Sequence, residues 1–453
     1  MSADWTDALA TALGAPVQTD ADILASFARD QAPLAPAGTP IALVRARSID
    51  DVVTTLRFAN ERRIPVVTRA AGTGLAGGAN AVDGCIVLLV SGLDRIVGID
   101  EATRTAVVEP GVLNGVLAKE VAARGLNYAP DPASRDISTI GGNIATNAGG
   151  ACCLKYGVTG DHVAALKLVL ADGTVLRTGG LTKKNVAGLD LTRLVVGSEG
   201  TLGVIVEATV RLLPAPRPPS TLVAFFETLD DAARAIVTMN AGADLSLLEV
   251  MDQVTVSAVD EMTRMDLDTS AAALVLVQSD ARDASATIAR CEEVCHRHAA
   301  KSVLCTDDVE EGRLLLGARR MALPALERKG TTLLDDVAVP TPAIPEMLDR
   351  IRRTGERHGL VIGTFGHAGD GNLHPTIVFD RADAASASSA FEAFDEIVRD
   401  AMRLGGTISG EHGIGSLKQA YLGPMVGEAE RALMARIKAA FDPNGILNPG
   451  KAL

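Results

Sequence analysis

The sequence predicts an α+β protein of two main domains, and three observations support this fold class. Hydrophobic residues make up 47% of the 453 residues and charged residues 22%, which is typical of a globular chain. Short strand-like runs alternate with amphipathic helical stretches along both halves of the chain. Between the halves, the segment 214–219 carries four prolines in six residues. Neither a helix nor a central strand tolerates that density of proline, so the segment marks a domain boundary.

The elements predicted before the boundary surround a glycine-rich loop. Ser48 and Asp51 have the spacing of a capping box, and the helix that follows them ends before Pro65. The apolar run at 66–68 predicts a buried strand that leads directly into the glycine-rich residues 69–78. The remaining predictions are strands at 85–90, 96–100 and 105–109, a helix at 113–124 closed by Gly125, and a hairpin of 164–170 with 175–178.

The elements predicted after the boundary alternate between strands and amphipathic helices. Strands are predicted at 222–226, 245–250 and 274–277, and helices at 230–239 and 284–298. The order helix, strand, turn, strand then returns at 342–379. This second half is therefore also α+β.

The chain is acidic, with 43 Lys and Arg against 56 Asp and Glu and a formal net charge of −13. This balance argues against a protein that binds a nucleic-acid groove and against a polybasic membrane anchor. The mean field would also repel an anionic substrate, so a site for such a substrate needs its own local cations.

The sequence favours a soluble, reduced protein of the cytoplasm. Six cysteines, two of them the adjacent Cys152 and Cys153, do not form the framework of a disulfide-rich protein. No apolar run reaches the 18 or more residues of a membrane span, and residues 1–7 lack the basic region of a secretory signal. We therefore expect no integral membrane segment.

The glycine-rich segment Gly72-Thr-Gly74-Leu-Ala-Gly77 matches the dinucleotide fingerprint GxGxxG. A Rossmann site also needs a helix that begins at the third glycine and faces the pyrophosphate. Residues 78–84 are instead small and turn-forming, and a strand is predicted directly after them. We therefore reject a Rossmann site. An ordinary loop and a turn whose backbone N–H groups bind phosphate both remain open from this segment alone.

Later segments favour the phosphate-binding alternative. They are 130–132 followed by 140–150, then 197–203, and finally 441–451. Each segment offers hydrogen-bond donors without bulky side chains, and loops needed only for turning would not require so many Asn, Ser and Thr residues.

The segments 69–78, 141–150, 197–203 and 448–450 resemble the FAD-binding segments of vanillyl-alcohol-oxidase (PCMH) type flavoproteins. From about residue 40 to 451 the chain resembles the FAD-linked D-2-hydroxyacid dehydrogenases, which include D-lactate dehydrogenase, the glycolate oxidase flavoprotein subunit and D-2-hydroxyglutarate dehydrogenase. The resemblance implies a two-part FAD-binding domain. Its three regions are the N-terminal segment and FAD-binding domain at 1–214, an α+β cap domain with an antiparallel sheet at 215–405, and a C-terminal segment at 406–453 that completes the active site.

The resemblance also implies non-covalent FAD, because Thr73 stands near the position where some members carry a flavin-linked histidine. The residues that it assigns to FAD are Arg69, Ala71, Gly72, Thr73, Gly74, Leu75, Gly77, Gly78, Pro130, Asp131, Ser138, Gly141, Gly142, Asn143, Thr146, Asn147, Gly149, Glu199, Gly200, Gly203, Val204, Ile205 and Asn448.

A second group of motifs predicts a metal site. His367 and His374 flank the turn-forming residues 368–372, so two strands can fold back and bring both imidazoles to one side. Two imidazoles and the carboxylate of Glu411 form a three-ligand set that leaves one position open, as catalytic zinc requires. His412, beside Glu411, is then available as a base. The resemblance assigns the same roles, with Zn²⁺ as the expected metal and Mn²⁺ or a similar ion as the alternative.

Cys291-Glu-Glu-Val-Cys295-His-Arg-His298 also looks like a metal motif but lies in an amphipathic helical pattern. It lacks a second pair of ligands and the closely spaced cysteines of a cluster-binding ferredoxin. We interpret both cysteines as core thiols.

Arg319 lies in a segment that resembles the one supplying an arginine to the substrate carboxylate in this family. A guanidinium can bind a carboxylate with two hydrogen bonds. Arg319 and Arg320 could both be solvated helix charges, and a shift of register would give the role to Arg320. We favour Arg319.

Three departures from the family bear on the substrate. Leu323 and Leu334 stand where the hydroxyglutarate enzymes have a Thr and a Lys for the distal carboxylate, and Thr376 corresponds to their Asn. Two leucines cannot pair a second carboxylate, and burying it without a partner would be costly. This favours a 2-hydroxy acid with a small or apolar side chain.

We therefore predict FAD-dependent oxidation of a small D-2-hydroxy acid, D-lactate above others. The alternatives are a glycolate oxidase flavoprotein subunit, a D-2-hydroxyglutarate dehydrogenase and a non-catalytic FAD-binding subunit of a complex. The expected partners are the hydroxy acid and an external electron acceptor, which would be a quinone, a cytochrome, an electron-transfer flavoprotein or a partner subunit. A homodimer fits this prediction, as does peripheral association with a membrane through the acceptor.

Overall fold

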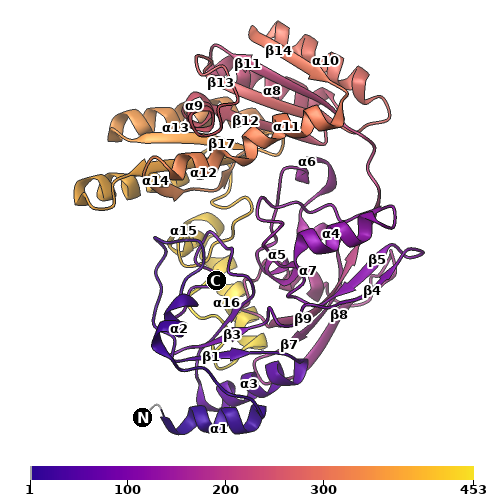
Figure 1. Ribbon diagram of the computed structural model, residues 1–453. Coiled ribbons are helices and arrows are strands. Elements are labelled where there is room, and N and C mark those ends of the chain that lie inside the picture. The colour runs from indigo at the N-terminus through magenta and orange to yellow at the C-terminus, as the bar shows by residue number, and fades with distance from the viewer. Residues whose placement is uncertain (1–2) are drawn as a thin grey trace. The chain divides into compact units, whose positions relative to one another are not determined.

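The computed structural model describes residues 3–453, which form two compact units (Figure 1). Unit 1 contains residues 3–149, 157–215 and 411–453, and unit 2 contains residues 150–156 and 216–410. The break after residue 215 lies inside the proline-rich segment 214–219. The last break falls after residue 410 rather than after 405, because Thr407 forms a bridge with Ala338 and the Ser409 hydroxyl donates to Asp336 at 2.8 Å.

Residues 150–156 need a correction, because the sequence places them in the first domain and their contacts place them in unit 2. Lys155 pairs there with Asp244 at 2.9 Å and with Asp280 at 2.7 Å, and the Tyr156 hydroxyl also donates to Asp280. Side-chain pairs across long sequence separations carry no local pattern, so the sequence could not predict this placement.

Unit 1 contains a parallel sheet and an antiparallel sheet. The parallel sheet has the order β1-β3-β2, with β1 at Ala42–Arg45, β2 at Val66–Arg69 and β3 at Ile86–Leu89. The antiparallel sheet has the order β4-β5-β9-β7-β8, with strands Ile96–Asp100, Thr105–Val108, Val204–Arg211, Val163–Val169 and Val175–Gly179 in that order. A small pair joins β6 (Leu126–Asn127) to β10 (Leu213–Pro214).

The helices of unit 1 confirm several local predictions. Ser48 and Asp51 form both hydrogen bonds of the capping box at the start of α3, and Gly125 follows α4 with a φ of +70°. The helices are α1 (Ala3–Leu13), α2 (Ala21–Ser26), α3 (Ile49–Arg62), α4 (Asn114–Ala122), α5 (Ile140–Thr146), the 3₁₀-helix η1 (Thr159–His162), α7 (Leu191–Val195), α15 (Gln419–Val426) and α16 (Glu428–Phe441).

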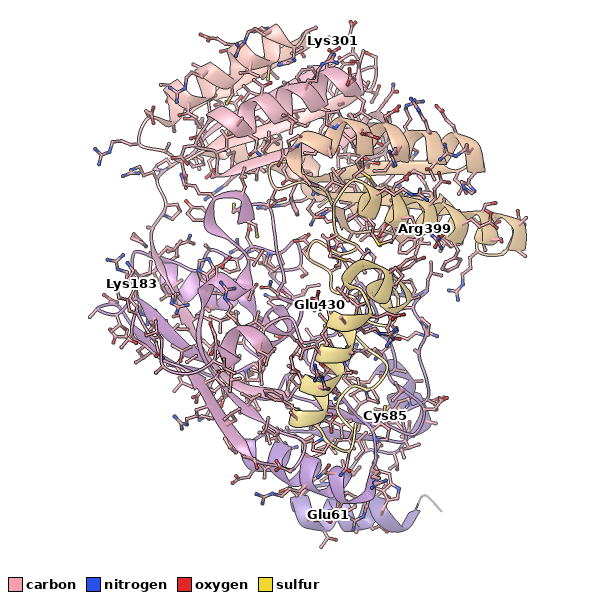
Figure 2. All side chains as sticks on the ribbon, turned by 180° about the vertical axis from the view of Figure 1, so that it is seen from behind. Glu61, Cys85, Lys183, Lys301, Arg399 and Glu430 are labelled. Atoms are coloured by element: carbon pink, nitrogen blue, oxygen red, sulfur yellow. The ribbon has the colours of Figure 1, made fainter. Side chains whose placement is uncertain are left out.

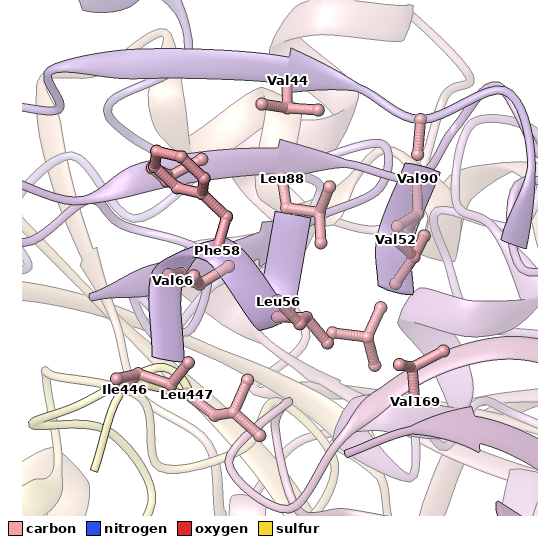
Figure 3. Close-up of a cluster of buried hydrophobic side chains, with 14 of the residues drawn as sticks. Val44, Val52, Leu56, Phe58, Val66, Leu88, Val90, Val169, Ile446 and Leu447 are labelled. Carbon is pink, nitrogen blue, oxygen red and sulfur yellow. The ribbon is translucent and has the colours of Figure 1, made fainter. Parts of the chain in front are cut away.

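The core of unit 1 includes residues from both ends of the sequence (Figure 3). Ile446 and Leu447 are buried in the same cluster as Leu56 and Val66. The Val66 N–H donates to the Ile446 carbonyl at 2.7 Å, and the Asn448 N–H donates to the Val66 carbonyl at 2.8 Å. Burying a Leu or Ile side chain contributes about 1.5–3 kcal/mol, so the tail is an integral part of this core.

Unit 2 is built on one antiparallel sheet of eight strands. Along its path the order is β14-β11-β13-β12-β17-β18-β15, and β16 also pairs with β18. The strands are β11 (Ser220–Phe226), β12 (Leu247–Asp252), β13 (Ala273–Ser279), β14 (Ala300–Thr306), β15 (Thr331–Leu334), β16 (Val337–Ala338), β17 (Val361–His367) and β18 (Asn372–Phe379).

Helices cover both faces of this sheet, and every residue of β11 and β13 is accordingly buried. One group of helices packs together as α8 (Leu229–Gly242), α10 (Ala284–Arg297), α13 (Ile344–His358) and α14 (Ala384–Arg403) (Figure 1). The second group contains α9 (Gln253–Thr263), α11 (Val309–Arg320) and α12 (Ala322–Glu327), and the unit also has α6 (Cys153–Tyr156) and the 3₁₀-helix η2 (Thr341–Ala343). The apolar core under the second group contains Phe225, Met251 and Phe365.

The edge strand β14 carries Lys301 (Figure 2), which pairs with Asp268 at 2.7 Å. A charged side chain on an edge strand disfavours further strand pairing. Across residues 3–453, every helix is too short or too polar to cross a membrane.

Candidate active site

The segments predicted to bind FAD meet in unit 1. The Asn448 amide donates to the carbonyls of Gly78 and Glu199, at 2.9 and 2.6 Å. The Glu199 N–H in turn donates to the Ala145 carbonyl at 2.8 Å. One asparagine near the C-terminus therefore connects the first glycine-rich loop to the 197–203 turn, and that turn is bound to the 140–149 segment.

The first glycine-rich loop runs from β2 to β3 with no helix between them, which agrees with the rejection of a Rossmann site. Gly72 and Gly77 have φ values of +72° and +77°, which disfavour any other residue. A Cβ atom on Gly72 would lie 2.1 Å from the Arg69 guanidinium. The loop also contains the predicted residues Ala71, Thr73, Gly74 and Leu75.

The second segment is a correction, because the sequence suggested a turn-forming loop and residues Ile140–Thr146 form the helix α5. Its N-cap, Thr139, accepts a hydrogen bond from the Gly142 N–H at 3.2 Å. A Cβ atom on Gly141 would lie 2.4 Å from the Pro110 Cβ, so glycine is required there by close packing rather than by a turn. Asn147 then ends the helix with a φ of +54°.

Two predicted FAD residues have buried polar atoms that fit a bound group. The Ser138 hydroxyl and the Asn143 amide nitrogen are buried, and neither has a hydrogen-bond partner among the described residues. Buried polar atoms are nearly always hydrogen-bonded, so donors of this kind suit a cofactor. The other predicted residues occupy the loop after β6 (Pro130, Asp131), α5 and its end (Thr146, Gly149), the turn before β9 (Gly200, Gly203), and the buried start of β9 (Val204, Ile205).

Glu199 is a buried carboxylate beside these segments. It has a φ of +51° and accepts hydrogen bonds from the N–H groups of Ile414 and Gly415 at 2.7 and 2.8 Å. Burial raises the pKa of Glu199 to about 7. Burial also lowers the pKa of Lys451 to about 8. The Lys451 ammonium donates to the Asn80 carbonyl, and this buried lysine was not predicted from the sequence.

Glu411 and His412 lie beside the same segments within unit 1. A Cβ atom on Gly149 would lie 2.5 Å from Glu411 Oε2, and one on Gly413 would lie 2.9 Å from Glu199 Oε1. His412 Nε2 is 3.7 Å from Glu411 Oε1. The glycines at 149 and 413 thus allow the chain that carries the predicted base to pass close to the predicted FAD-binding segments.

The predicted histidine pair lies in unit 2 on a β-hairpin. β17 and β18 pair antiparallel, with Phe365 opposite His374 and His367 opposite Asn372. The rings of His367 and His374 therefore share one face of the sheet, with centroids 5.2 Å apart. The turn residues between them produce the fold-back that the sequence predicts.

Each imidazole faces a buried carboxylate of the same unit. His367 Nδ1 is 2.6 Å from Glu249 Oε1, and His374 Nδ1 is 3.7 Å from Asp336 Oδ1. The 2.6 Å contact of His367 has the length of a hydrogen bond, and a histidine that donates Nδ1–H to a carboxylate keeps its lone pair on Nε2, which is the usual arrangement around a bound metal. The donor set of unit 2 therefore fits the predicted metal chemistry.

Arg319, on α11, points at the same carboxylate. Its Nε donates to Glu249 Oε2 at 2.6 Å, and its guanidinium carbon lies 4.7 Å from the centroid of the Phe365 ring. The Arg319 side chain is only 13% exposed, whereas Arg320 is exposed to solvent. This geometry favours Arg319 over Arg320 as the residue of the site.

Glu249 is fully buried, and two opposing effects act on its pKa. Burial alone would raise the pKa, but His367 and Arg319 outweigh burial and lower it below the usual range. Neither Glu249 nor Asp336 was predicted from the sequence. The available signal was an acidic residue inside an apolar run, as in Leu247-Leu-Glu-Val-Met251.

The three residues predicted to face the substrate side chain also lie in unit 2. Thr376 is fully buried opposite Leu334 in the sheet, and its hydroxyl donates to the His374 carbonyl at 3.3 Å. Leu323 and Leu334 pack against the apolar cluster that contains Phe365.

The sequence matches known families over nearly its whole length. Residues 40–179 match the family described as FAD binding domain, and residues 215–452 match FAD linked oxidases, C-terminal domain. A glycolate oxidase subunit GlcD of Bacillus subtilis is 43% identical over 416 residues, which is 91% of this chain and 88% of the relative. A D-lactate dehydrogenase of Anaerostipes hadrus is 34% identical over 444 residues, which is 95% of this chain and 93% of the relative.

The chain belongs to the FAD-linked oxidases. Two solved structures with this fold are similar to the chain over nearly its whole length. P-cresol methylhydroxylase has a TM-score of 0.81 at 18% identity, and 4-ethylphenol oxidase of Gulosibacter chungangensis has 0.80 at 21%. Both matches cover 99% of this chain and 96% of the other. They confirm the predicted PCMH-type fold and its mixed α+β architecture.

In this FAD-linked oxidase, the cysteines of the rejected metal motif are core residues. Cys291 and Cys295 lie on α10 and are almost fully buried. Cys295 Sγ lies 4.0 Å from the Met239 sulfur. Burial raises the pKa of Cys291 to about 11, which disfavours the thiolate that a metal would require.

Proposed function

We propose that this FAD-linked oxidase converts a small D-2-hydroxy acid to the 2-oxo acid, and D-lactate to pyruvate in particular. The observation that carries the proposal is the group of Arg319, Glu249, His367 and His374 on one face of the unit 2 sheet. It combines a cation for a carboxylate with imidazoles suited to a metal. The similarity to relatives named for glycolate and D-lactate supports the same substrate class.

Two groups would complete the site. The glycine-rich segments of unit 1, with Ser138 and Asn143, would hold non-covalent FAD, and His367, His374 and Glu411 would hold one divalent metal. We favour Zn²⁺, with Mn²⁺ as the alternative, because imidazole and carboxylate ligands suit both ions. Bound flavin supplies a two-electron acceptor, and a bound divalent ion lowers the pKa of a coordinated hydroxyl group.

The chain's own residues orient the substrate and move one proton. Arg319 binds the substrate carboxylate through the terminal nitrogens of its guanidinium, since its Nε is engaged by Glu249. His412 Nε2 takes the proton from the substrate hydroxyl, and the hydrogen on Cα leaves as a hydride. Together these steps remove two electrons and two protons from the substrate, which leaves the 2-oxo acid.

The substrate side chain is selected by Leu323, Leu334 and Thr376. These three residues offer no positive charge, and the two leucines belong to an apolar cluster. A second carboxylate would have to be desolvated there without a cationic partner, which costs several kcal/mol. A methyl group or a hydrogen would not carry this penalty, so the site supports lactate or glycolate over 2-hydroxyglutarate.

Glycolate oxidation as the flavoprotein subunit of a complex is the second candidate. Its support is the 43% identity to a glycolate oxidase subunit GlcD, which exceeds the 34% identity to a D-lactate dehydrogenase. A partner subunit would then accept the electrons. Otherwise the acceptor would be a quinone, a cytochrome or an electron-transfer flavoprotein, with peripheral membrane association where the acceptor lies in a membrane.

A visible spectrum of the purified protein and an anaerobic substrate panel test the proposal. D-lactate should bleach the flavin bands, L-lactate should not, and a chelator should slow the bleaching. Faster bleaching by glycolate would favour the second candidate. Flavin bands that no 2-hydroxy acid bleaches would point to a non-catalytic FAD-binding subunit, and bleaching by L-lactate alone would contradict the stereochemistry.

A further inference from the structure

One buried carboxylate in unit 2 contacts two residues with different proposed tasks. Glu249 Oε1 lies 2.6 Å from His367 Nδ1, and Glu249 Oε2 lies 2.6 Å from Arg319 Nε. The Glu249 side chain is 1% exposed. Each carboxylate oxygen is therefore used by a separate donor, and the carboxylate itself is shielded from solvent.

The fold explains why this contact exists. Glu249 lies on β12, and the β12–β17 register places Met251 opposite Phe365. The same register places Glu249 opposite His367, and opposite residues of an antiparallel pair share a face of the sheet. Arg319 of α11 reaches Glu249 there. An acidic residue in this apolar layer is costly unless both of its oxygens are paired.

We propose that Glu249 is the positioning residue of the active site, which sets the orientation of His367 toward the metal and of Arg319 toward the substrate carboxylate. The inference rests on the function proposed above. The carboxylate holds the Nδ1–H tautomer of His367 and so directs the Nε2 lone pair at the metal position. The same carboxylate fixes the guanidinium plane through Nε, so that the terminal nitrogens face the substrate.

This arrangement has a chemical consequence for substitutions. Glutamine has one acceptor oxygen, so Glu249→Gln would place its amide NH₂ group against one of two N–H donors. Aspartate keeps the charge but is one methylene shorter, so it can reach only one of the two partners at hydrogen-bonding distance. Each variant should therefore lose the hydrogen bond to His367, the hydrogen bond to Arg319, or both.

Asp252 provides a matched control on the same strand. It is also buried, but its oxygens accept hydrogen bonds from the backbone N–H groups of Thr255 and Thr364, each at 2.8 Å. Asp252→Asn therefore removes a buried carboxylate from β12 and leaves the contacts of Arg319 and His367 in place. Both substitutions should lower the melting temperature, which makes stability an uninformative measure of positioning.

The experiment measures zinc affinity and substrate kinetics in the flavin-loaded enzyme. Zn²⁺ affinity is obtained by competition with a colorimetric chelator, and the KM and kcat for D-lactate are measured at saturating zinc. For Glu249→Gln we expect a 10–100-fold weaker zinc affinity. We also expect the KM for D-lactate to rise about 10-fold, because Arg319 loses the charged carboxylate that holds its guanidinium in place. Asp252→Asn should change neither quantity by more than about 2-fold.

Glu249→Asp is the second variant, for the case in which the glutamine variant does not fold. It should weaken zinc binding or raise KM, because it reaches only one partner. Zinc affinity and KM like those of Asp252→Asn in either folded variant would overturn the inference. If no 2-hydroxy acid reduces the flavin of the wild-type enzyme, the proposed function fails, while the zinc competition still tests the Glu249–His367 contact.

Discussion

Glu199 provides a prediction whose magnitude follows from its environment. Its carboxylate is almost fully buried, and burial raises its pKa from 4.5 to about 7. Since the folded-state pKa is above the unfolded value, the stabilising contribution is fully present below pH 4.5 and is lost as the pH rises through 7. The total loss is about 3 kcal/mol, of which about 2 kcal/mol falls between pH 5.0 and 7.5.

Glu199→Gln removes this pH dependence. The amide has one acceptor oxygen for the two N–H groups of Ile414 and Gly415, which costs about 1–3 kcal/mol at every pH. Other buried acids also titrate, such as Asp252, whose pKa burial raises to about 6. The informative quantity is therefore the difference in unfolding free energy between wild type and variant, in which the shared groups cancel.

The assay is urea unfolding of flavin-free protein at pH 5.0 and 7.5, followed by circular dichroism. We expect the wild type to be the more stable protein at pH 5.0 and its advantage over Glu199→Gln to shrink by about 2 kcal/mol at pH 7.5. Glu430→Gln, on the exposed part of α16 (Figure 2), should show the same difference from wild type at both pH values. An advantage for Glu199 that is unchanged or larger at pH 7.5 would refute the reasoning.

Three further predictions concern the active site and the core. His412→Ala should retain FAD and slow anaerobic flavin reduction by D-lactate by about 10²–10⁴-fold in stopped-flow, because it removes the proposed base; an unchanged rate would exclude that role. Arg319→Lys should raise the KM for D-lactate about 10–100-fold with a smaller effect on kcat, because lysine has no planar fork; steady-state kinetics would show an unchanged KM if Arg319 did not bind the carboxylate. Lys438→Met should lower the unfolding free energy by about 3–5 kcal/mol, because the Lys438 ammonium donates to the carbonyls of Thr201 and Leu447 and to the fully buried Asp442 carboxylate. Urea unfolding at constant pH tests this last expectation, with a change below about 1 kcal/mol as the contradicting result.

Local chemistry made much of the fold predictable. The capping box of Ser48 and Asp51, the hairpin around Asp172-Gly173 and the proline-rich boundary are each encoded within a few residues. The fold-back that places His367 and His374 together is likewise encoded by the turn between them.

Features that depend on contacts far apart in sequence were not predictable. Gly141 looks like a turn residue, but its neighbour Pro110 requires the absence of a Cβ atom inside a helix. An acidic residue in the apolar run of β12 is a local signal, but it does not identify Arg319 and His367 as the partners of Glu249. In both cases the residue type is explained by a contact with a residue far away in the sequence, which no local pattern identifies.

The tail residues packed under β2 also affect the order in which the protein can fold during synthesis. β2 begins at Val66, but its backbone neighbours Ile446 and Asn448 are synthesised roughly 380 residues later. At a synthesis rate of about 5–20 residues per second, β2 remains without these two neighbours for roughly tens of seconds. Residues 216–410, which supply the whole eight-stranded sheet, emerge within that interval. Unit 1 can therefore be completed only after the sheet of unit 2 has been synthesised, and β2 lacks these two backbone partners until then.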